Sequence, residues 1–444
     1  MNIGLDHRLS LYETERLRLD KTSAYDVHSR DGSVPSHSEK AVLVKFLFDD
    51  DSFSYETLRT AGFAVYGGAD FGEVICAARE IGEGDEANWH RSWTATAQRV
   101  HEIGETSLAG GHRVSARESL LRASNYYRTA ELFLRTNPTA DPEVTRLSTL
   151  SRQTFATAAE LFDTPVEPVL IPYEDTHLPG YLFQVDASGA ARPTIVANSG
   201  FDSTLEELYF AIAAAALRRG YNVLAFDGPG QGSVLREQGL PLRHDWEAVL
   251  TPVLNYALSR PEILPDKITL FGYSLGGYLV ARAAAFDDRI AALILNDGIL
   301  DFNSAFDRAL PSELASSIYE GRDELANPEL TTFTTISTQI RWALNNGVWA
   351  IGADSYADLV RQTRLFCLQG VADQITVPAL IMDAENDQFL KGQPQEIERA
   401  LTNSETTLVT LTEAEGAGEH CHMGSMLRAH QTMFDWLETT LAIS

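Results

Sequence analysis

The chain has 444 residues, 44% of them hydrophobic and 22% charged, which is typical of a globular protein with enough apolar residues for a large core. Its formal net charge of -27 argues against nucleic acid and anionic membranes as partners, because both carry negative charge themselves. Three cysteines without a CxxC pair favour a reducing compartment. The N-terminal MNIGLDHRLSLYETERLRLDK lacks the apolar segment of a signal peptide, and no apolar run is long enough for a membrane span. We therefore expect a cytoplasmic protein.

The first part of the chain, residues 1–165, favours helices. Breaker-free or periodic runs cover 87–103, 115–134 and 142–161, and in the second of these apolar residues recur every three or four positions. Asn137-Pro138 follows that run and ends the helix. This segment carries no catalytic motif, so we predict a helical domain over residues 1–165 that packs as a unit and contributes to a cap over a site.

Residues 166–444 change to short apolar runs typical of strands. The predicted strands are VEPVLIPY (166–173), GYLFQV (180–185), PTIVAN (193–198), YNVLAFD (221–227), KITLFGY (267–273), AALILND (291–297), PALIMD (378–383) and TTLVTL (406–411). From the third strand onward they alternate with helical runs, which indicates a mostly parallel eight-stranded sheet with helices on both faces. The first two strands fit an antiparallel hairpin with its turn at 177–180. Residues 298–376 are too long for a loop, so we predict a helical insertion that completes the cap.

The stretch KITLFGYSLGGYLVARAAAF contains Gly272-Tyr273-Ser274-Leu275-Gly276 between a predicted strand and a predicted helix. GxSxG in this context is a nucleophile elbow, a strained turn that lifts the serine hydroxyl above the sheet at a helix N-terminus. The Leu275 backbone N–H is then one donor of an oxyanion hole, and we expect Phe201, in the loop after PTIVAN, to supply the second. The Gly-rich DGPGQG at 227–232 lacks the Lys-Ser/Thr of a phosphate loop and is interpreted as a structural turn.

A serine nucleophile needs a base and an acid that orients it, and the expected chain order is Ser, acid, His. The strand PALIMD ends in AENDQFL, and among its acids Asp387 is best placed to reach across the sheet edge, with Glu385 as the alternative. The base is expected between the last strand and the last helix, where EGAGEHCHMG offers two histidines, His420 and His422. Position alone does not choose between them, although His420 is closer to the flexible glycine turn.

These motifs together resemble the α/β-hydrolase superfamily. NSGFDSTLEELYF, AFDGPGQG, GYSLGGYLVARAAAFDDRIAALI, ENDQF, and EGAGEHCHMG followed by FDWL are similar to the group of 2,6-dihydroxypseudooxynicotine hydrolase and the fungal yellowish-green-pigment polyketide hydrolases, which are relatives of FrsA-like esterases. The resemblance covers roughly residues 85–440 and implies a triad of Ser274, Asp387 and His420, since the group uses the first histidine of this segment. It also implies hydrolysis of a carbon–carbon bond beside a ketone for several members and of esters for others.

We therefore predict an enzyme of secondary metabolism that cleaves an aryl ketone, β-diketone or polyketide-like small molecule through an acyl-enzyme. An ester or thioester hydrolase or acyl transferase with the same triad is the alternative, and a binding protein on a hydrolase scaffold is disfavoured because all three triad positions are filled. Asp297, Asp301, Trp89 and Trp93 are candidate substrate contacts. No cofactor is expected, and a Cys/His zinc site is disfavoured for want of a third ligand. A homodimer is also among the expectations.

Overall fold

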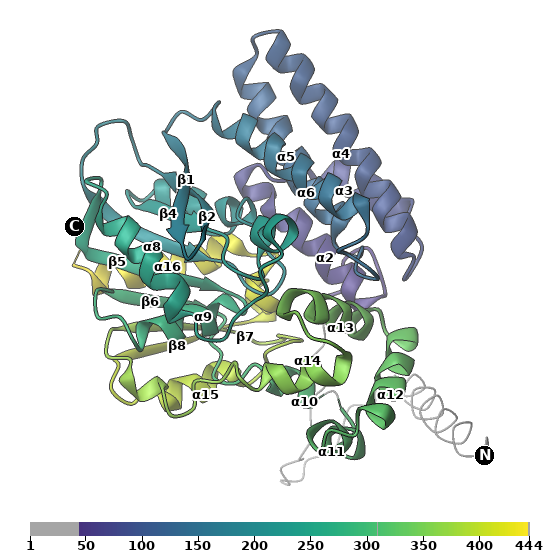
Figure 1. The fold of residues 1–444 in the computed structure, drawn as a ribbon. Helices are drawn as coiled ribbons and strands as arrows, with labels where there is room; N and C mark the ends of the chain where they lie inside the picture. Colours follow the sequence, from purple (N-terminus) through teal and green to yellow (C-terminus); the bar gives the residue numbers. More distant parts are fainter. Residues whose placement is uncertain (1–43, 309, 443–444) are drawn as a thin grey trace, which may run out of the picture. The chain divides into compact units, whose positions relative to one another are not determined.

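The chain forms a set of helices first and then a sheet, with a second set of helices inserted before the last two strands (Figure 1). The computed structural model describes residues 44–308 and 310–442, all of which belong to one compact unit. Part of the predicted domain 1–165, and the N-terminal segment considered for a signal peptide, lie outside the described residues. The domain boundaries near 165, 298 and 376 stay predictions. None of the described helices combines the length and apolarity that a bilayer crossing requires.

Five α-helices precede the sheet within the described residues. They are α2 (Asp51–Gly62), α3 (Phe71–Arg79), α4 (Glu86–Ala109), α5 (Arg113–Glu131) and α6 (Pro142–Ala159). Side-chain caps begin several of them: Asp50 accepts from the Phe53 N–H at 3.0 Å, and Asp141 does the same for α6, whose first residue is Pro142. The helices α4, α5 and α6 match the three predicted runs, whereas α2 and α3 were not predicted.

The sheet has eight strands in the order β1-β2-β4-β3-β5-β6-β7-β8, which confirms the predicted fold class. Their bounds are β1 (Val166–Tyr173), β2 (Thr176–Phe183), β3 (Arg192–Asn198), β4 (Asn222–Phe226), β5 (Ile263–Tyr273), β6 (Ala292–Asn296), β7 (Ala379–Ala384) and β8 (Thr406–Leu411). β2 pairs antiparallel with both β1 and β4, and the remaining pairs are parallel. All the strands from β3 onward therefore end at one edge, where loops after parallel strands meet.

The predicted hairpin is present, but its turn lies earlier than expected. Tyr173 pairs with Thr176, so the turn is formed by Glu174 and Asp175, and Glu174 has a left-handed φ of 44°. Gly180, expected in the turn, lies inside β2, where a Cβ would come within 2.6 Å of the Ala225 carbonyl oxygen. That glycine is a site of close strand approach rather than a turn residue.

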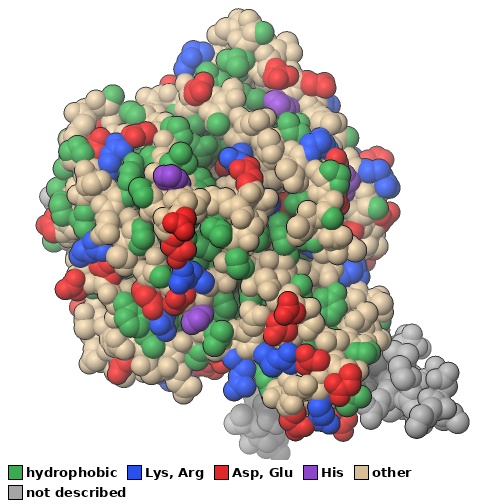
Figure 2. Space-filling model, viewed as in Figure 1, with side chains coloured by type: hydrophobic (Ala, Val, Ile, Leu, Met, Phe, Trp, Pro, Cys, Tyr) green, Lys and Arg blue, Asp and Glu red, His purple; other side chains and the backbone are tan. Residues whose placement is uncertain are grey.

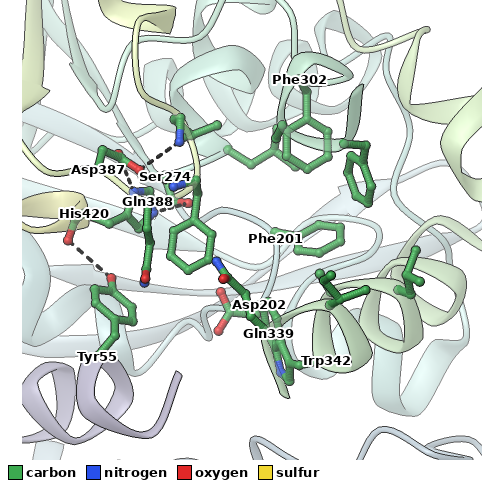
Figure 3. A pocket seen from close by; sticks show the side chains of 18 of the residues that line it. Tyr55, Phe201, Asp202, Ser274, Phe302, Gln339, Trp342, Asp387, Gln388 and His420 are labelled. Atoms are coloured by element: carbon green, nitrogen blue, oxygen red, sulfur yellow. Dashed lines mark hydrogen bonds and ion pairs between the residues drawn. The ribbon is translucent and has the colours of Figure 1, made fainter. Parts of the chain in front are cut away.

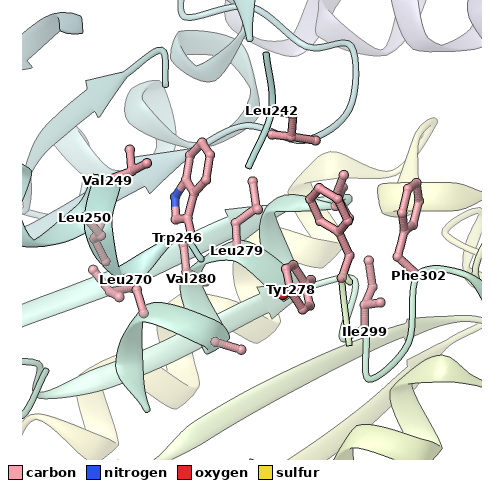
Figure 4. Packing of buried hydrophobic residues seen from close by; sticks show 14 of the residues in the cluster. Leu242, Trp246, Val249, Leu250, Leu270, Tyr278, Leu279, Val280, Ile299 and Phe302 are labelled. Atoms are coloured by element: carbon pink, nitrogen blue, oxygen red, sulfur yellow. The ribbon is translucent and has the colours of Figure 1, made fainter. Parts of the chain in front are cut away.

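Apolar side chains cover both faces of the sheet. On one face, α8 (Glu247–Leu258) and α9 (Gly276–Ala284) pack against β5, and Figure 4 shows Trp246, Leu279 and Leu270 within this layer. On the other face, α16 (Met426–Thr440) and the short helical segment 209–217 pack against the strands. The core fixes the strands rigidly, so the loops at their carboxyl ends are held in place from below.

The insertion between β6 and β7 is helical, as its sequence predicts. It contains α10 (Ser304–Asp307), α11 (Ser312–Tyr319), α12 (Asp323–Ile336), α13 (Thr338–Ile351) and α14 (Tyr356–Thr363). α13 lies beside α2 in Figure 1, and Arg341 binds Glu86 of α4 through two hydrogen bonds of 2.9 and 2.7 Å. The Trp342 indole N–H donates to the Leu132 carbonyl at 3.1 Å. The N-terminal helices and the insertion therefore form a joint cover.

Acidic side chains are spread over the face seen in Figure 2, among basic and hydrophobic ones. This distribution fits the formal charge of -27. On this face, therefore, the acidic side chains do not gather at one place that would mark a site.

Candidate active site

Ser274 lies on a tight turn between β5 and α9. Its backbone has a left-handed φ of 58°, a conformation that a non-glycine residue adopts only under tertiary constraint. The turn packs against the end of β3 so closely that a Cβ on Gly276 would come within 2.7 Å of the Asn198 carbonyl oxygen. The glycines of the motif are therefore required by space, and the turn presents the Ser274 hydroxyl above the sheet edge.

The structure brings the three predicted triad residues together (Figure 3). His420 Nε2 lies 2.9 Å from Ser274 Oγ, and His420 Nδ1 lies 2.7 Å from an Asp387 carboxylate oxygen. All three residues come from loops at the carboxyl ends of β5, β7 and β8. A carboxylate on one imidazole nitrogen and a hydroxyl on the other is the arrangement in which histidine can take the serine proton.

His422, the other candidate base, has different surroundings. It is fully buried, and its Nδ1 lies 3.0 Å from the Ala417 carbonyl oxygen. Its Nε2 has no hydrogen-bond partner among the described residues. Burial lowers the pKa of His422 to about 4. Left-handed φ values of 53° at Cys421 and 59° at His422 turn the chain here, and His422 contacts the Ala417 carbonyl of its own loop instead of Ser274.

The Asp387 carboxylate is held by its own loop. One oxygen accepts the backbone N–H groups of Phe389 and Leu390 at 2.7 and 2.8 Å, and the other faces His420. Burial acts to raise the pKa of Asp387, but the attraction and hydrogen bond of His420 and the backbone donor outweigh it, so the pKa is lowered. The alternative acid, Glu385, instead accepts from the Glu413 N–H at 2.8 Å.

Asp297, at the end of β6, also contacts the base. One of its oxygens lies 2.9 Å from His420 Nδ1, and the other has no hydrogen-bond partner among the described residues. Asp297 does not line the cavity described below, so its expected role as a substrate contact is corrected to contact with the histidine. Burial, and next the charge of Asp387, raise the pKa of Asp297 to about 7. Nothing in the local sequence indicated this contact, which depends on how the β6 and β8 loops meet.

The other three expected substrate contacts also lie elsewhere. Asp301 accepts from the Asn303 N–H at 3.0 Å and begins the insertion, without reaching the cavity. Trp89 and Trp93 are fully buried in the core between the N-terminal helices, where their rings lie 5.8 Å apart. The structure therefore places these residues away from the cavity at Ser274, and the two indoles pack the helices against one another.

Two backbone N–H groups are available beside Ser274. Neither the Leu275 nor the Phe201 N–H has a hydrogen-bond acceptor among the described residues. The loop after β3 approaches the elbow closely, because a Cβ on Gly200 would come within 2.9 Å of the Leu275 nitrogen. This placement suits the pair to a developing oxyanion.

Side chains from three distant segments hold the loop that carries Phe201. Gln231 donates to the Ser199 carbonyl at 2.6 Å, and Asn346 of α13 donates to the Phe201 carbonyl at 3.2 Å. Arg59 of α2 reaches Asp202 at 2.7 Å. Gln231 belongs to DGPGQG, which the sequence indicated only as a turn. Its side chain is a positioning group that no local pattern reveals.

A cavity of about 590 Å³ opens at Ser274 and His420. Tyr55, Phe201 and Phe389 lie near the triad, and the Tyr55 hydroxyl donates to the His420 carbonyl at 3.2 Å. The remaining walls come from α2 and from the inserted helices, chiefly α12 and α13. The volume suits a drug-sized organic molecule, and the joint cover limits the access of water.

Asp297, His420 and Cys421 present ligand atoms within 4.8 Å of one another, which is a possible metal-binding geometry. Both nitrogens of His420 already face partners, namely Asp387 and Ser274. Burial raises the pKa of the Cys421 thiol to about 12, whereas a metal needs the thiolate. These residues suit proton transfer better than metal binding.

The strand order and the serine on its strained turn define the α/β-hydrolase fold. The chain belongs to this family: the model of the alpha/beta hydrolase family matches residues 198–432, and that of the FrsA-like esterases matches residues 81–307. It is an enzyme of the hydrolase class, as its curated relatives are.

Among those relatives, 20-hydroxy-prefusarin hydrolase FUS2 of Gibberella moniliformis is 36% identical, over 89% of this chain and 98% of its own. Hydrolase LUC6 of a Fusarium species is 35% identical over the same shares of the two chains. The crystal structure of 2,6-dihydroxy-pseudo-oxynicotine hydrolase has a TM-score of 0.68 at 21% identity, over 86% of this chain and 95% of that one. This last likeness concerns the fold.

Proposed function

We propose that the enzyme hydrolyses a carbon–carbon bond beside a ketone, on a bulky polyketide-like or aryl β-diketone small molecule, with Ser274 as nucleophile. The observation that carries the proposal is the unbroken hydrogen-bonded chain from Ser274 through His420 to Asp387, which opens into a covered cavity. The names of the relative FUS2, a 20-hydroxy-prefusarin hydrolase, and of the pseudo-oxynicotine hydrolase support an organic small molecule as substrate. The cytoplasmic location and the homodimer stay predictions from the sequence.

The first half of the reaction forms an acyl-enzyme. His420 Nε2 accepts the Ser274 proton while Oγ attacks the substrate carbonyl carbon, and the Leu275 and Phe201 N–H groups bind the oxyanion. When the tetrahedral intermediate collapses, the carbon–carbon bond breaks and its electron pair leaves as an enolate. The enolate takes the proton from His420. Such a leaving group must be stabilised by conjugation, which is why a 1,3-dicarbonyl or an aryl ketone fits this chemistry.

The second half releases the acid. A water molecule gives its proton to His420 and attacks the acyl carbon, and the Ser274 oxygen leaves and recovers a proton from the imidazolium. Asp387 stays ionised throughout and holds the imidazole in the required tautomer. From a 1,3-diketone the products are a carboxylic acid and a ketone, and the enzyme returns to its starting state.

Electrostatics at His420 supports its role as the base. Burial disfavours the imidazolium, but Asp387 first, and then Cys421 and Asp297, outweigh burial, so the pKa of His420 is raised above its usual value. These groups stabilise the imidazolium that forms when His420 takes the serine proton, and the same shift requires a pH at which the resting imidazole is neutral.

Covalent labelling and a substrate pair test the proposal. A fluorophosphonate should modify Ser274 in the folded protein and fail with Ser274→Ala, as read by intact mass spectrometry. The purified enzyme should then turn over benzoylacetone to benzoate or acetate faster than it hydrolyses phenyl acetate. If Ser274 is labelled and the enzyme hydrolyses phenyl acetate efficiently without cleaving the diketone, the enzyme is a serine esterase. Absence of labelling would contradict the assignment of Ser274 as the nucleophile.

A further inference from the structure

The cavity has two chemically different walls. The inserted helices and the loop before them supply an apolar wall, formed by Phe302, Phe306, Leu330, Phe333, Ile340 and Leu344. The other side carries Glu56 and Arg59 of α2 with Asp202 and Ser203 of the loop after β3. In Figure 3, Phe302 lies on one side, while Asp202 and Gln339 lie on the side of Tyr55 and Trp342.

The cation in the polar wall is already neutralised by the protein. The Arg59 guanidinium binds Glu207 through two hydrogen bonds of 2.6 and 2.8 Å. It also reaches Asp202 at 2.7 Å and the Ser203 hydroxyl at 3.0 Å. Four of the five N–H donors of Arg59 therefore have short partners, and the fifth faces Glu56 at 3.4 Å, so the protein's own carboxyl groups surround the cation.

The carboxyl groups of this wall, in contrast, have capacity left. Glu56 is 7% exposed, and its contacts are long: 3.4 Å from each oxygen to Arg59 Nη1 and 3.6 Å to Arg128 Nη1. Only one Asp202 oxygen has a hydrogen bond to a described residue, the one to Arg59. A buried carboxyl without short hydrogen bonds is costly, and a donor placed in the cavity would remove that cost.

The charges of the cluster favour the same class of ligand. Three carboxyl groups, Glu56, Asp202 and Glu207, face two guanidinium groups, Arg59 and Arg128. With all five groups ionised, this wall carries a net negative charge, which attracts hydrogen-bond donors and repels anions locally, whereas the cations Arg308 and Lys391 line the cavity on the side of the insertion and the β7 loop.

We propose that Glu56 and Asp202 form a subsite for a hydroxyl or amide N–H group at the end of an otherwise apolar acyl substrate, whose body lies against the aromatic wall. This inference rests on the proposed function, because it places the substrate in the same cavity as Ser274. It narrows the substrate to a long, mainly apolar ketone with a neutral hydrogen-bond donor away from the scissile bond.

Alkyl phosphonofluoridates that end in a methyl, hydroxyl or carboxylate group test the subsite through the rate at which they modify Ser274. Across several chain lengths, we expect one length at which the hydroxyl probe reacts about tenfold faster than the methyl probe, as one hydrogen bond to an anionic acceptor warrants. The carboxylate probe should be slowest at that length. The shortest probe cannot span the cavity, so its rate of reaction serves as the reference for changes in the reactivity of Ser274 itself.

The variants Glu56→Gln and Asp202→Asn should each reduce the hydroxyl preference, and Glu247→Gln serves as a matched control because Glu247 pairs with Arg282 outside the cavity. Binding of long-chain methyl ketones with and without a terminal hydroxyl to Ser274→Ala protein, followed by tryptophan fluorescence, gives a second measure that needs no reaction. No hydroxyl preference in that binding assay, or a preference that survives in both variants, overturns the subsite. If no probe labels Ser274 but the binding assay shows a hydroxyl preference, the proposed serine chemistry is wrong and the subsite is retained.

Discussion

The loops after β6 and β7 each place an acidic side chain beside the same nitrogen of His420. The two loops differ in the hydrogen-bond donors that they offer to these side chains. Asp387 Oδ2 lies 2.7 Å and Asp297 Oδ2 lies 2.9 Å from Nδ1. The β7 loop gives Asp387 two backbone N–H donors at 2.7 and 2.8 Å. The nearest backbone donor to Asp297 is the Cys421 N–H at 3.4 Å.

The comparison indicates that the groups around each acid, rather than its distance to the histidine, separate the two pKa values. Burial acts against ionisation of both groups, but His420, then the hydrogen bond to Asp297 and the Leu390 N–H, lower the pKa of Asp387, whereas burial and the charge of Asp387 raise the pKa of Asp297 to about 7. Asp387 is thus the anion that orients the base. Asp297 retains a proton over most of the acidic range and is a reserve acceptor.

The comparison requires that His420 be the base. Replacement of His420 should therefore have the largest effect on activity. His420→Ala should lower kcat by about 10⁴- to 10⁶-fold, since loss of a triad base removes the whole unit. His422→Ala should keep activity within about tenfold and lose stability instead, because a buried side chain is truncated. Initial rates and thermal unfolding of both variants measure this. Activity in His420→Ala and none in His422→Ala would reverse the assignment.

Asp297 can accept the Nδ1 proton of His420 when Asp387 is replaced. The second largest effect on activity is therefore expected when both acids are replaced together. Asp387→Asn leaves an amide on Nδ1, but Asp297 can still accept the Nδ1 proton, so we expect a loss of about 10³-fold rather than the full 10⁴-fold. The double variant with Asp297→Asn should reach the full 10⁴-fold loss, while Asp297→Asn alone should lose no more than about twofold. Strictly additive losses would show that the two carboxylates act independently.

A steric change in the loop after β3 tests the oxyanion site without touching either acid. The Cβ of Gly200→Ala would lie 2.7 Å from the Tyr273 carbonyl oxygen and 2.9 Å from the Leu275 nitrogen, so the loop must shift. We expect kcat to fall about 10²-fold with KM changed far less, as when one oxyanion donor is lost. Gly82→Ala is the matched control, since its nearest heavy atom would lie 3.9 Å away. Unchanged kcat in Gly200→Ala would argue against Phe201 as a donor.

The fold and the triad could be predicted from the sequence because their determinants are local. An apolar run such as TTLVTL and a GxSxG between strand and helix carry their meaning within a few residues. Asp297 could not be assigned, since its role arises where the β6 and β8 loops meet. The residues of α2 that line the cavity, Glu56 and Arg59, are buried polar groups, and apolar periodicity does not detect those.

The smallest effect on rate belongs to Asp297→Asn, and its clearest consequence should be on stability. The pKa of Asp297 rises from an ordinary value of 3.8 to about 7 in the folded protein, so between these values the folded state binds more protons than the unfolded state. The free energy of unfolding of the wild type therefore falls as pH rises from about 4 to about 7 through this group. Asn carries no such proton, so the variant should escape this loss.

The variant should consequently gain stability over the wild type as the pH is raised, by on the order of 2–4 kcal/mol between pH 5 and pH 8. Urea unfolding at the two pH values measures the difference, and Asp435→Asn, at an exposed position of α16, is the control. A variant less stable or no more stable than the wild type at pH 8, with the same difference at pH 5, would mean that Asp297 is already ionised at pH 5. In that case the two loops would supply equivalent carboxylates, and the donors of the β7 loop would not distinguish them.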